Sequence, residues 1–252
     1  MQISVVIITF NEQEEIGRCI DSLIGIADEI LVVDSFSTDE TESISKSKGA
    51  RFIQHKFEGY IKQKNWAMDQ ASYDWILSLD ADECISPNLF QSILQIKQLP
   101  KYDSYSMNRL NFYCNKAIKT CGWYPDKKIR LWNRNVGKWG GTDPHDKIVL
   151  QNTTITGHLN GDLWHYTYST NEDMLKQVEN FANIASKQLK KKSLWQLILK
   201  MIFSPAFNFI KHYLFHLGFI DGSNGLLICY HQCREVYLKY YRAIKLKLQS
   251  IY

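Results

Sequence analysis

Two carboxylates spaced two residues apart, Asp80 and Asp82, follow directly on an apolar stretch in the segment LSLDADE. Carboxylates at positions i and i+2 at the end of a strand can converge on one ion, and oxygen-rich sites suit Mg²⁺ or Mn²⁺. Such an ion could hold the phosphates of a nucleotide ligand. An arbitrary tripeptide of this kind is more often a solvated acidic turn, so the motif needs support from elsewhere in the chain.

That support comes from three further acids at strand-end or adjacent loop positions, Glu12, Asp34 and Asp39. Their clustering favours an active site over a solvated turn. A glycine-rich phosphate loop is absent, because TFNE stands after the first apolar stretch where a dinucleotide fold would place glycines. A nucleotide-cofactor dehydrogenase is therefore disfavoured.

The elements that must position these acids alternate along the first hundred residues. Continuous apolar runs predict buried strands, and apolar residues at helical spacing predict helices between them. This order predicts an α/β sheet that binds ligands at the carboxyl ends of its strands. The expected strands are Ile3–Thr9, Glu29–Val33, Arg51–Gln54 and Asp74–Leu79, and the expected helices are Glu12–Ile24, Thr38–Lys48 and Tyr60–Ser72.

Composition limits the class of protein. The chain has 252 residues, of which 45% are hydrophobic and 22% charged, enough for one sizeable core and against bulk disorder. The N-terminal MQISVVIITFNEQEE has no basic region and reads as a core strand, not a signal peptide. The sequence contains no stretch of 18 uncharged apolar residues, so it predicts no membrane-spanning helix. Six cysteines without paired zinc spacing suggest reduced thiols in a cytosolic protein.

After Pro100 the pattern changes. Residues 102–165 are rich in Tyr, Trp, Asn and Gly and predict mixed or antiparallel strands. Residues 171–190 predict an amphipathic helix, and residues 194–220 and 225–248 predict two more. Pro205 is expected to kink or split the first of these two.

Charge is uneven along the chain. Residues 186–252 carry 11 Lys and Arg against two acids, and aromatic residues recur at helical spacing over 194–220. A helix of this kind can lie in a membrane interface with its cations toward anionic headgroups. A helical subdomain or homodimer face with a solvated lysine side is the alternative. Nucleic acid is disfavoured, because these aromatics have apolar neighbours rather than a basic groove.

Taken together, the motifs resemble family 2 glycosyltransferases of the GT-A fold. The resemblance rests on VVIITFNEQEEIGRCIDSL, VVDSFSTDET, QKNWA and DWILSLDADE, and it continues through GGTDPHD, LWHYTYST and FHLGFIDGSNGL. The later motifs are similar to those of the bacterial subgroup that includes the lipopolysaccharide-core β-1,4-glucosyltransferases. The resemblance implies an α/β, Rossmann-like mixed sheet flanked by helices, with a C-terminal helical extension. We expect a catalytic domain at 1–170, divided at residue 100 into nucleotide-sugar and acceptor halves, and the extension at 171–252.

The resemblance also implies roles for individual residues. Asp82 would ligate a divalent metal, Mn²⁺ or Mg²⁺, and His165 in LWHYTY would complete the metal site, although a lone histidine near aromatics could equally be a core residue. Gln63, Lys64 and Asn65 fill a Q-[KR]-N segment, where a cation beside a diphosphate is sensible. The expected nucleotide-sugar site comprises Thr9, Asn11, Glu12, Asp34, Asp39, Lys64, Asp80 and Ala81.

Transfer with inversion needs a carboxylate that accepts the proton of the attacking hydroxyl. Relatives in the subgroup usually show His-Glu where this chain has His145-Asp146, so the carboxylate reaches about one methylene less. We favour Asp146 as the base over Asp143, with His145 as a neighbour or acceptor contact. Asp126 and Asp162 are lesser candidates, and a solvated loop acid is the alternative for both.

The resemblance thus implies an inverting, divalent-metal-dependent hexosyltransferase. It would use a nucleotide sugar, a UDP-hexose by expectation, and a saccharide or lipid-linked acceptor of lipopolysaccharide core or another surface glycan. The expected location is cytoplasmic, peripheral on the anionic inner face of the bacterial cytoplasmic membrane. A sugar-phosphate nucleotidyltransferase is disfavoured because TFNEQEE replaces a glycine-rich loop. A non-catalytic, membrane-associated scaffold with a degenerate fold is the other alternative.

Overall fold

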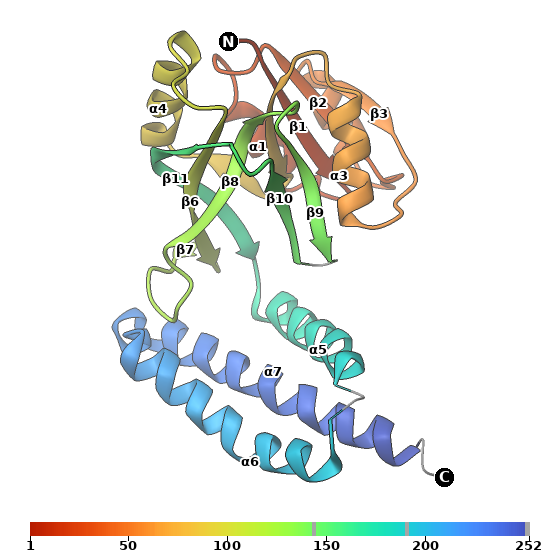
Figure 1. The fold of residues 1–252 in the computed structure, drawn as a ribbon, viewed down its shortest axis with the longest axis vertical. Coiled ribbons are helices and arrows are strands. Elements are labelled where there is room, and N and C mark those ends of the chain that lie inside the picture. Colours follow the sequence, from red (N-terminus) through yellow and green to blue (C-terminus); the bar gives the residue numbers. More distant parts are fainter. Residues whose placement is uncertain (143–144, 190–191, 250–252) are drawn as a thin grey trace. The chain divides into compact units, whose positions relative to one another are not determined.

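The computed structural model describes residues 1–142, 145–189 and 192–249 (Figure 1). The chain divides into two compact units. The first, here called the sheet unit, comprises residues 1–109 and 126–165, and the second, the helical unit, comprises residues 110–125 and 166–252. Residues 110–125, which the sequence places with the acceptor half of a catalytic domain, therefore belong with the C-terminal helices.

The sheet unit is built on a mixed sheet with the strand order β3-β2-β1-β4-β8-β6-β11-β5. The strands β1 to β4 are parallel to one another, whereas β8 pairs antiparallel with both β4 and β6. A separate antiparallel hairpin consists of β9 and β10, and the short β7 pairs with β6. The strands are β1 (Ile3–Thr9), β2 (Glu29–Asp34), β3 (Arg51–Gln54), β4 (Trp75–Asp80), β5 (Glu83–Ile85), β6 (Ser104–Tyr113), β7 (Lys116–Ala117), β8 (Asp126–Asn133), β9 (Gly137–Thr142), β10 (His145–Leu150) and β11 (Thr156–Tyr168).

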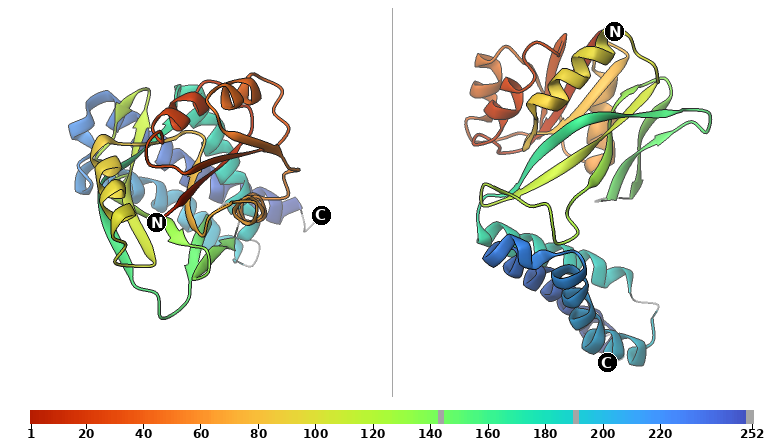
Figure 2. Two further views of the ribbon diagram at one scale, coloured as in Figure 1. Left: turned by 90° about the horizontal axis from the view of Figure 1, so that it is seen from above. Right: turned by 90° about the vertical axis from the view of Figure 1, so that its left-hand side faces the viewer.

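Alternation of side chains along the strands gives the sheet two apolar faces. Ile3, Val5 and Ile7 of β1 pack on the face covered by α1 (Ile16–Asp21), α2 (Thr41–Ser47) and α4 (Pro87–Gln98). Val6, one residue out of step, packs on the other face, which α3 (Tyr60–Asp69) and the β9–β10 hairpin cover (Figure 2). The expected mixed sheet with flanking helices is confirmed.

The helices of the sheet unit are shorter than their apolar patterns suggest. The helix expected from Glu12 begins only at Ile16, because the Glu12 carbonyl accepts from the amides of Glu15 and Ile16 in a preceding turn. The polar residues after β1 are thereby left in loop conformation, where they can contribute to the site.

The helical unit contains α5 (Asn171–Gln188), α6 (Leu194–Ile210) and α7 (Gly222–Gln249), with a short π-helix at Lys211–Phe215 and a short 3₁₀ helix at Gly218–Asp221. Capping boxes start α5 at Thr170 and α6 at Ser193. Of the expected kink or split at Pro205, the split does not occur: α6 continues through this residue, which is buried. The proline removes one backbone donor, and the packing of α6 along α7 is sufficient to keep the helix continuous.

An apolar stripe lies exposed along α6 and the turns that follow it. Trp195, Phe203, Phe207 and Phe215 are each between 67% and 79% exposed. Phe203 and Phe207 are four residues apart, so these two rings share one side of α6. No helix in the described part of the chain is both long enough and apolar enough to cross a membrane.

Candidate active site

Three strand ends bring polar residues together at one edge of the sheet. In the parallel register Thr9 of β1 lies opposite Asp34 of β2, and Ile8 lies opposite Asp80 of β4. The carboxyl ends of these neighbouring strands therefore place Thr9, Asp34 and Asp80 side by side, as the sequence predicts for a ligand-binding edge.

The loops after β1 and β2 are tied to each other. Asp34 is fully buried and accepts from the amide of Ser37 at 2.8 Å and from its hydroxyl. The Ser37 hydroxyl in turn accepts from the amide of Asn11 at 2.8 Å, and Asn11 Oδ1 accepts from the Thr38 amide at 2.8 Å. Asn11 has a positive φ of 54°. These contacts fix the rim of the site before any ligand enters.

Asp39 serves the same loops. Its carboxylate accepts from the Thr41 hydroxyl at 2.6 Å, from the Thr41 amide at 3.0 Å and from the Gln13 amide at 3.1 Å. Burial alone would raise the pKa of Asp39, but these hydrogen bonds outweigh it and lower that pKa. Asp39 therefore holds the rim together from within the loop.

Glu12 has an unusual environment. Burial, followed by the negative charges of Asp82, Glu15, Asp39 and Asp80, raises the pKa of its carboxyl to about 7. A carboxyl with this pKa changes its charge near neutral pH, and a nearby cation would favour the ionised form. Acidic crowding of this degree is typical of functional sites.

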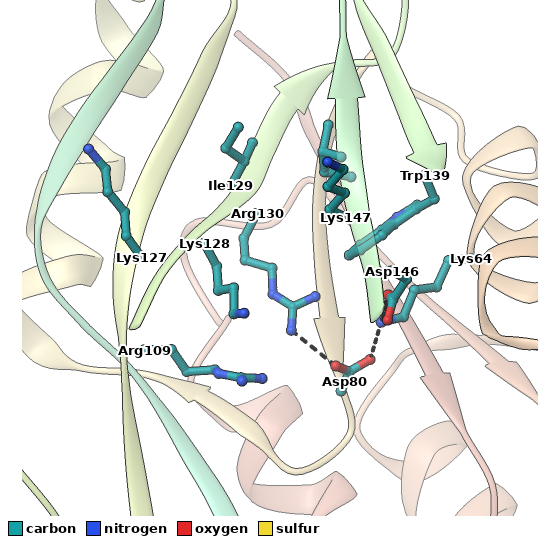
Figure 3. A pocket seen from close by; sticks show the side chains of 11 residues that line it. Lys64, Asp80, Arg109, Lys127, Lys128, Ile129, Arg130, Trp139, Asp146 and Lys147 are labelled. Atoms are coloured by element: carbon teal, nitrogen blue, oxygen red, sulfur yellow. Dashed lines mark hydrogen bonds and ion pairs between the residues drawn. The ribbon is translucent and has the colours of Figure 1, made fainter. Parts of the chain in front are cut away.

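Lys64 of α3 lies at the centre of the site (Figure 3). Its side chain is 4% exposed, and Nζ lies 3.0 Å from Asp80 Oδ1 and 2.8 Å from Asp146 Oδ2. The same ammonium lies 4.4 Å from the centre of the Trp139 ring, within cation–π distance. Asp80 Oδ2 also lies 3.0 Å from Arg130 Nη2. Burial would raise the pKa of Asp80, but Lys64 and Arg130 hold it well below its usual range.

The residues on either side of Lys64 fix the helix that carries it. Asn65 exchanges two hydrogen bonds with the backbone of Trp139, at 2.9 and 3.0 Å, and so clamps α3 to β9. Gln63 is fully buried and contacts His55 Nδ1 at 2.8 Å. Gln63 and Asn65 thus fix α3 on either side of Lys64. The lysine ammonium between them is held next to the two aspartates.

A second group of charges adjoins the first, and of its members sequence reasoning named only Asp126. Glu83 is fully buried, with Oε1 2.5 Å from Arg130 Nη2 and Oε2 accepting from the Asp80 amide at 3.1 Å. Arg109 donates to Asp126 at 2.8 and 3.0 Å. The alternating cations of DKKIRLW could have indicated this group, since i and i+2 residues of a strand share a face.

Asp82, in the turn that follows β4, meets His165 of β11. His165 Nε2 lies 3.1 Å from Asp82 Oδ2, and the His165 side chain is 13% exposed. The pairing of β11 with β5, in which His165 lies opposite Glu83, brings the histidine to the turn. In the described part of the chain, no three His, Cys, Asp or Glu side chains converge as metal ligands.

Comparison with known proteins identifies the family. The family model described as glycosyl transferase family 2 matches residues 4–151. An uncharacterised glycosyltransferase of Rickettsia prowazekii is 32% identical over 99% of this chain and 90% of its own length. The chain belongs to glycosyl transferase family 2. The expected enzyme class and GT-A-like fold are thereby confirmed.

Two other matches extend the comparison. The lipopolysaccharide core biosynthesis glycosyltransferase LpsC of Rhizobium meliloti is 22% identical to this glycosyltransferase over 95% of this chain and 93% of its own. A solved structure of glucosyl-3-phosphoglycerate synthase from Mycobacterium tuberculosis, in complex with Mn²⁺, UDP and glucosyl-3-phosphoglycerate, is 26% identical. That match covers 44% of each chain with a TM-score of 0.36.

The candidates for the catalytic base in this glycosyltransferase have different surroundings. Asp146 of β10 is 14% exposed and contacts Lys64. Asp126 is held by Arg109 and Lys128; burial would raise its pKa, but these cations lower it. Asp143 and the side chain of His145 lie outside the described residues.

The remaining expected residues are also located. Ala81 is buried in the turn between Asp80 and Asp82. Thr9 is 6% exposed, and its hydroxyl has no hydrogen-bond partner within the described residues. Asp162 uses its amide and carbonyl to bond Ser86 at the start of α4. The backbone of Asp162 therefore joins β11 to the start of α4.

A cavity of about 550 Å³ opens in front of Asp80 and Asp146 in the glycosyltransferase (Figure 3). Its walls come from α3, β4, β6, β8 and the β9–β10 hairpin, all within the sheet unit. Six of its lining residues are cationic: Lys64, Arg109, Lys127, Lys128, Arg130 and Lys147.

Proposed function

We propose that this glycosyltransferase moves a hexose from a UDP-sugar, with inversion and with the help of a divalent metal, to a surface-glycan acceptor. A saccharide or lipid-linked acceptor such as a lipopolysaccharide core would fit this role. The observation that carries the proposal is the placement of Lys64 between Asp80 and Asp146, beside the Asp82–His165 pair. The sheet unit would then be the catalytic unit.

The residues present fit a divalent cation. Asp80 is engaged by Lys64 and Arg130, which leaves the neighbouring Asp82 and His165 as an oxygen and a nitrogen donor 3.1 Å apart. A carboxylate and an imidazole suit Mn²⁺ and also admit Mg²⁺, provided that a diphosphate supplies further oxygens. When bound there, the ion would neutralise charge on the departing nucleoside diphosphate.

The donor's nucleoside would occupy the edge formed by β1 and β2. Buried Asp34 and the fixed loops at Asn11 and Asp39 provide a preformed rim, and the Thr9 hydroxyl is an unused polar group at its base among the described residues. The anomeric carbon would then face the cavity, because Asp80 lies at the next strand end. Lys64 and Arg130 favour the negative charge that develops on the leaving diphosphate.

Asp146 is our candidate for the base. The acceptor hydroxyl would give its proton to this carboxylate while its oxygen bonds to the anomeric carbon, and the bond from that carbon to the diphosphate oxygen would break. Asp80 is a weaker base because two cations hold it, whereas Asp146 pairs with one cation, Lys64, within the described residues. Lys64 also fixes the position of the Asp146 carboxylate.

The helical unit would attach the enzyme to the inner face of the bacterial cytoplasmic membrane. The exposed stripe of Trp195, Phe203 and Phe207 lies in a region with 11 Lys and Arg against two acids. Apolar burial together with attraction to anionic headgroups supports peripheral binding. Attachment to a membrane fits a lipid-linked acceptor. A homodimer face is the alternative use of the same stripe.

Donor binding tests the proposal most directly. Calorimetry with UDP, GDP and CMP, each with and without Mn²⁺, should show UDP binding that requires the metal. Asp82→Ala should weaken that binding by at least about tenfold, because it removes a charged metal ligand. Asp69→Ala, which removes an exposed acid from α3, is the matched control. A wild-type chain without metal-dependent nucleotide binding would favour the degenerate scaffold, and pyrophosphate release would identify a nucleotidyltransferase.

A further inference from the structure

The charges around the cavity do not balance. Six cationic side chains line it, against the two carboxylates of Asp80 and Asp146. Two further acids adjoin it, Glu83 and Asp126, which bond to Arg130 and Arg109 respectively. Counting these acids as well leaves an excess of two positive charges in and around one cavity, among the described residues.

The excess is not spread evenly. Lys64 and Arg130 are matched by three carboxylates, those of Asp80, Glu83 and Asp146. Arg109 of β6 and Lys128 of β8 share Asp126, at 2.8 and 3.1 Å, and Arg109 also lies 3.5 Å from Glu83. Figure 3 shows the side chains of Arg109, Lys128 and Arg130 extending toward the space in front of Asp80.

Two lysines complete the imbalance. Lys127 and Lys147 are exposed and form no ion pair within the described residues. Lys147 follows Asp146 directly in β10. Two side-chain donors of residues that line the same cavity, Arg130 Nε and Trp139 Nε1, are buried without a hydrogen-bond partner in the part of the chain that the structure describes. Each adds positive partial charge with no acceptor facing it there.

The position of these cations separates them from the nucleoside end of the donor. In the sheet order β8 and β6 lie on one side of β4, whereas β1 and β2, which carry Thr9 and Asp34, lie on the other. Arg109 and Lys128 therefore line the half of the site on the far side of Asp80. That half is left for the acceptor.

We infer that the acceptor is an anionic saccharide, with a phosphate or carboxylate group held by Arg109, Lys128 and Lys147 while its hydroxyl faces Asp146. The inference rests on the proposed function and names its acceptor class. A low-dielectric cavity lined by cations concentrates anionic ligands and orients them through charge-assisted hydrogen bonds. Lys147 and Asp146 line the same cavity, so an anion held in that cavity shares it with the base.

Binding of small acceptor analogues to the full chain tests this inference. Calorimetry at saturating UDP and Mn²⁺ would compare glucose 6-phosphate, glucuronate, glucose and inorganic phosphate at constant ionic strength. We expect either or both of the charged sugars to bind at least about tenfold more tightly than glucose, since hydrogen bonds to charged groups exceed neutral ones by this order. Preference between the two charged sugars then identifies the anionic group.

Charge-reversal variants locate the site. Lys128→Glu and Lys147→Glu should each weaken binding of the charged sugar by about tenfold or more, with UDP affinity unchanged. Lys138→Glu is the matched control, because this exposed lysine lies in the same hairpin and does not line the cavity. It should change the affinity by less than about twofold.

Three results would overturn the inference alone, each with metal-dependent UDP binding intact. They are equal binding of glucose and the charged sugars, equal binding of inorganic phosphate and glucose 6-phosphate, or a loss with Lys138→Glu as large as with Lys147→Glu. Absence of UDP binding in the wild type would instead overturn the proposed function, and the acceptor assignment with it.

Discussion

Lys64 and Asp146 are 82 residues apart in the sequence, yet Lys64 Nζ and Asp146 Oδ2 lie 2.8 Å apart. The contact joins α3 to β10, and the same ammonium reaches Asp80 at the end of β4. Because Lys64 is 4% exposed, water cannot readily replace it between the two carboxylates. One side chain therefore holds three elements of the site in register.

Replacing this lysine should damage both folding and activity. Lys64→Met leaves Asp80 and Asp146 facing each other without their shared cation, which should lower the free energy of unfolding by about 3 kcal/mol. Turnover of the UDP-sugar should fall by about 100-fold or more, since the charge beside the leaving diphosphate is lost. Urea denaturation and release of UDP measure the two effects.

The control for this variant is Lys62→Met, two residues earlier in α3, where the side chain is 71% exposed. It should change stability by less than about 0.5 kcal/mol and leave turnover unaltered. Normal turnover in Lys64→Met would contradict the central role given to this residue.

The choice of base can be tested by removing one charge. Asp146→Asn keeps the shape of the side chain but cannot accept the proton, so turnover should fall by about 1,000-fold or more. Binding of UDP with Mn²⁺ should change by less than about threefold, because Asp146 is assigned to the acceptor side. Single-turnover kinetics with a UDP-sugar, together with calorimetry, separates the two readouts.

Asp126→Asn is the comparison, because Arg109 and Lys128 already occupy that carboxylate. Its turnover should remain above that of Asp146→Asn. The assignment fails if Asp143→Asn abolishes turnover while Asp146→Asn retains it, which would identify Asp143 as the base.

Much of the sheet unit could be predicted from local sequence. Runs such as ISVVIIT are long, apolar and β-branched, so their burial as parallel strands follows from composition. Strand ends then fix where Thr9, Asp34 and Asp80 lie, since parallel strands end at one edge. The place where these three polar residues meet could therefore be predicted from the order of the strands alone.

The basic wall of the cavity could not be predicted in this way. Arg109 meets Asp126 because β6 and β8 pair in a particular antiparallel register, with an irregularity between Tyr105 and Ser106. A slip of one residue would turn these side chains to the other face. Register between strands distant in the sequence depends on the packing of the whole sheet. Local patterns do not contain that information.

Glu12 should make stability depend on pH. Its pKa is raised from 4.5 to about 7, so the folded chain binds more protons than the unfolded chain between these values. Stability should therefore decrease as pH rises through this window. In buffer without divalent metal, Glu12→Gln should be more stable than wild type by about 2 kcal/mol at pH 8, with little of that gain at pH 5.

Urea denaturation at the two pH values measures the effect. Glu14→Gln changes an exposed acid in the same turn, and its effect on stability should be the same at both pH values. A gain for Glu12→Gln that does not vary between pH 5 and pH 8 would show that Glu12 is not the titrating group.

Gly161 should tolerate no side chain. It has a positive φ of 98°, and an added Cβ would lie 2.2 Å from the Leu89 amide nitrogen near the start of α4. Gly161→Ala must displace the backbone, and this displacement costs free energy in addition to the strain of a positive φ. We therefore expect the free energy of unfolding to fall by more than about 3 kcal/mol. Gly49→Ala is the matched control, since φ is 79° there and nothing lies within 4 Å of the added carbon. It should cost only about 1 kcal/mol in urea denaturation, and equal losses for the two variants would contradict the argument from close approach.

The exposed stripe on α6 should bind anionic lipid. Phe203 and Phe207 are 67% and 68% exposed, and burying two phenylalanines in an interface is worth several kcal/mol. The double change Phe203→Ser and Phe207→Ser should therefore weaken sedimentation with phosphatidylglycerol vesicles by more than about tenfold. Phe57→Ser, which removes a 45% exposed ring from the sheet unit, should leave vesicle binding unchanged.

Salt and lipid charge separate the two contributions to this binding. Wild-type binding should weaken in about 0.5 M salt, because screening reduces the attraction of the helical unit's cations to anionic headgroups. It should also weaken on phosphatidylcholine vesicles, because their surface has no net charge to attract these cations. Sedimentation equilibrium of the same proteins without lipid tests the alternative. If the wild type is a dimer and the double variant a monomer, while both bind vesicles equally, the stripe is a homodimer face and the attachment to the membrane must be assigned elsewhere.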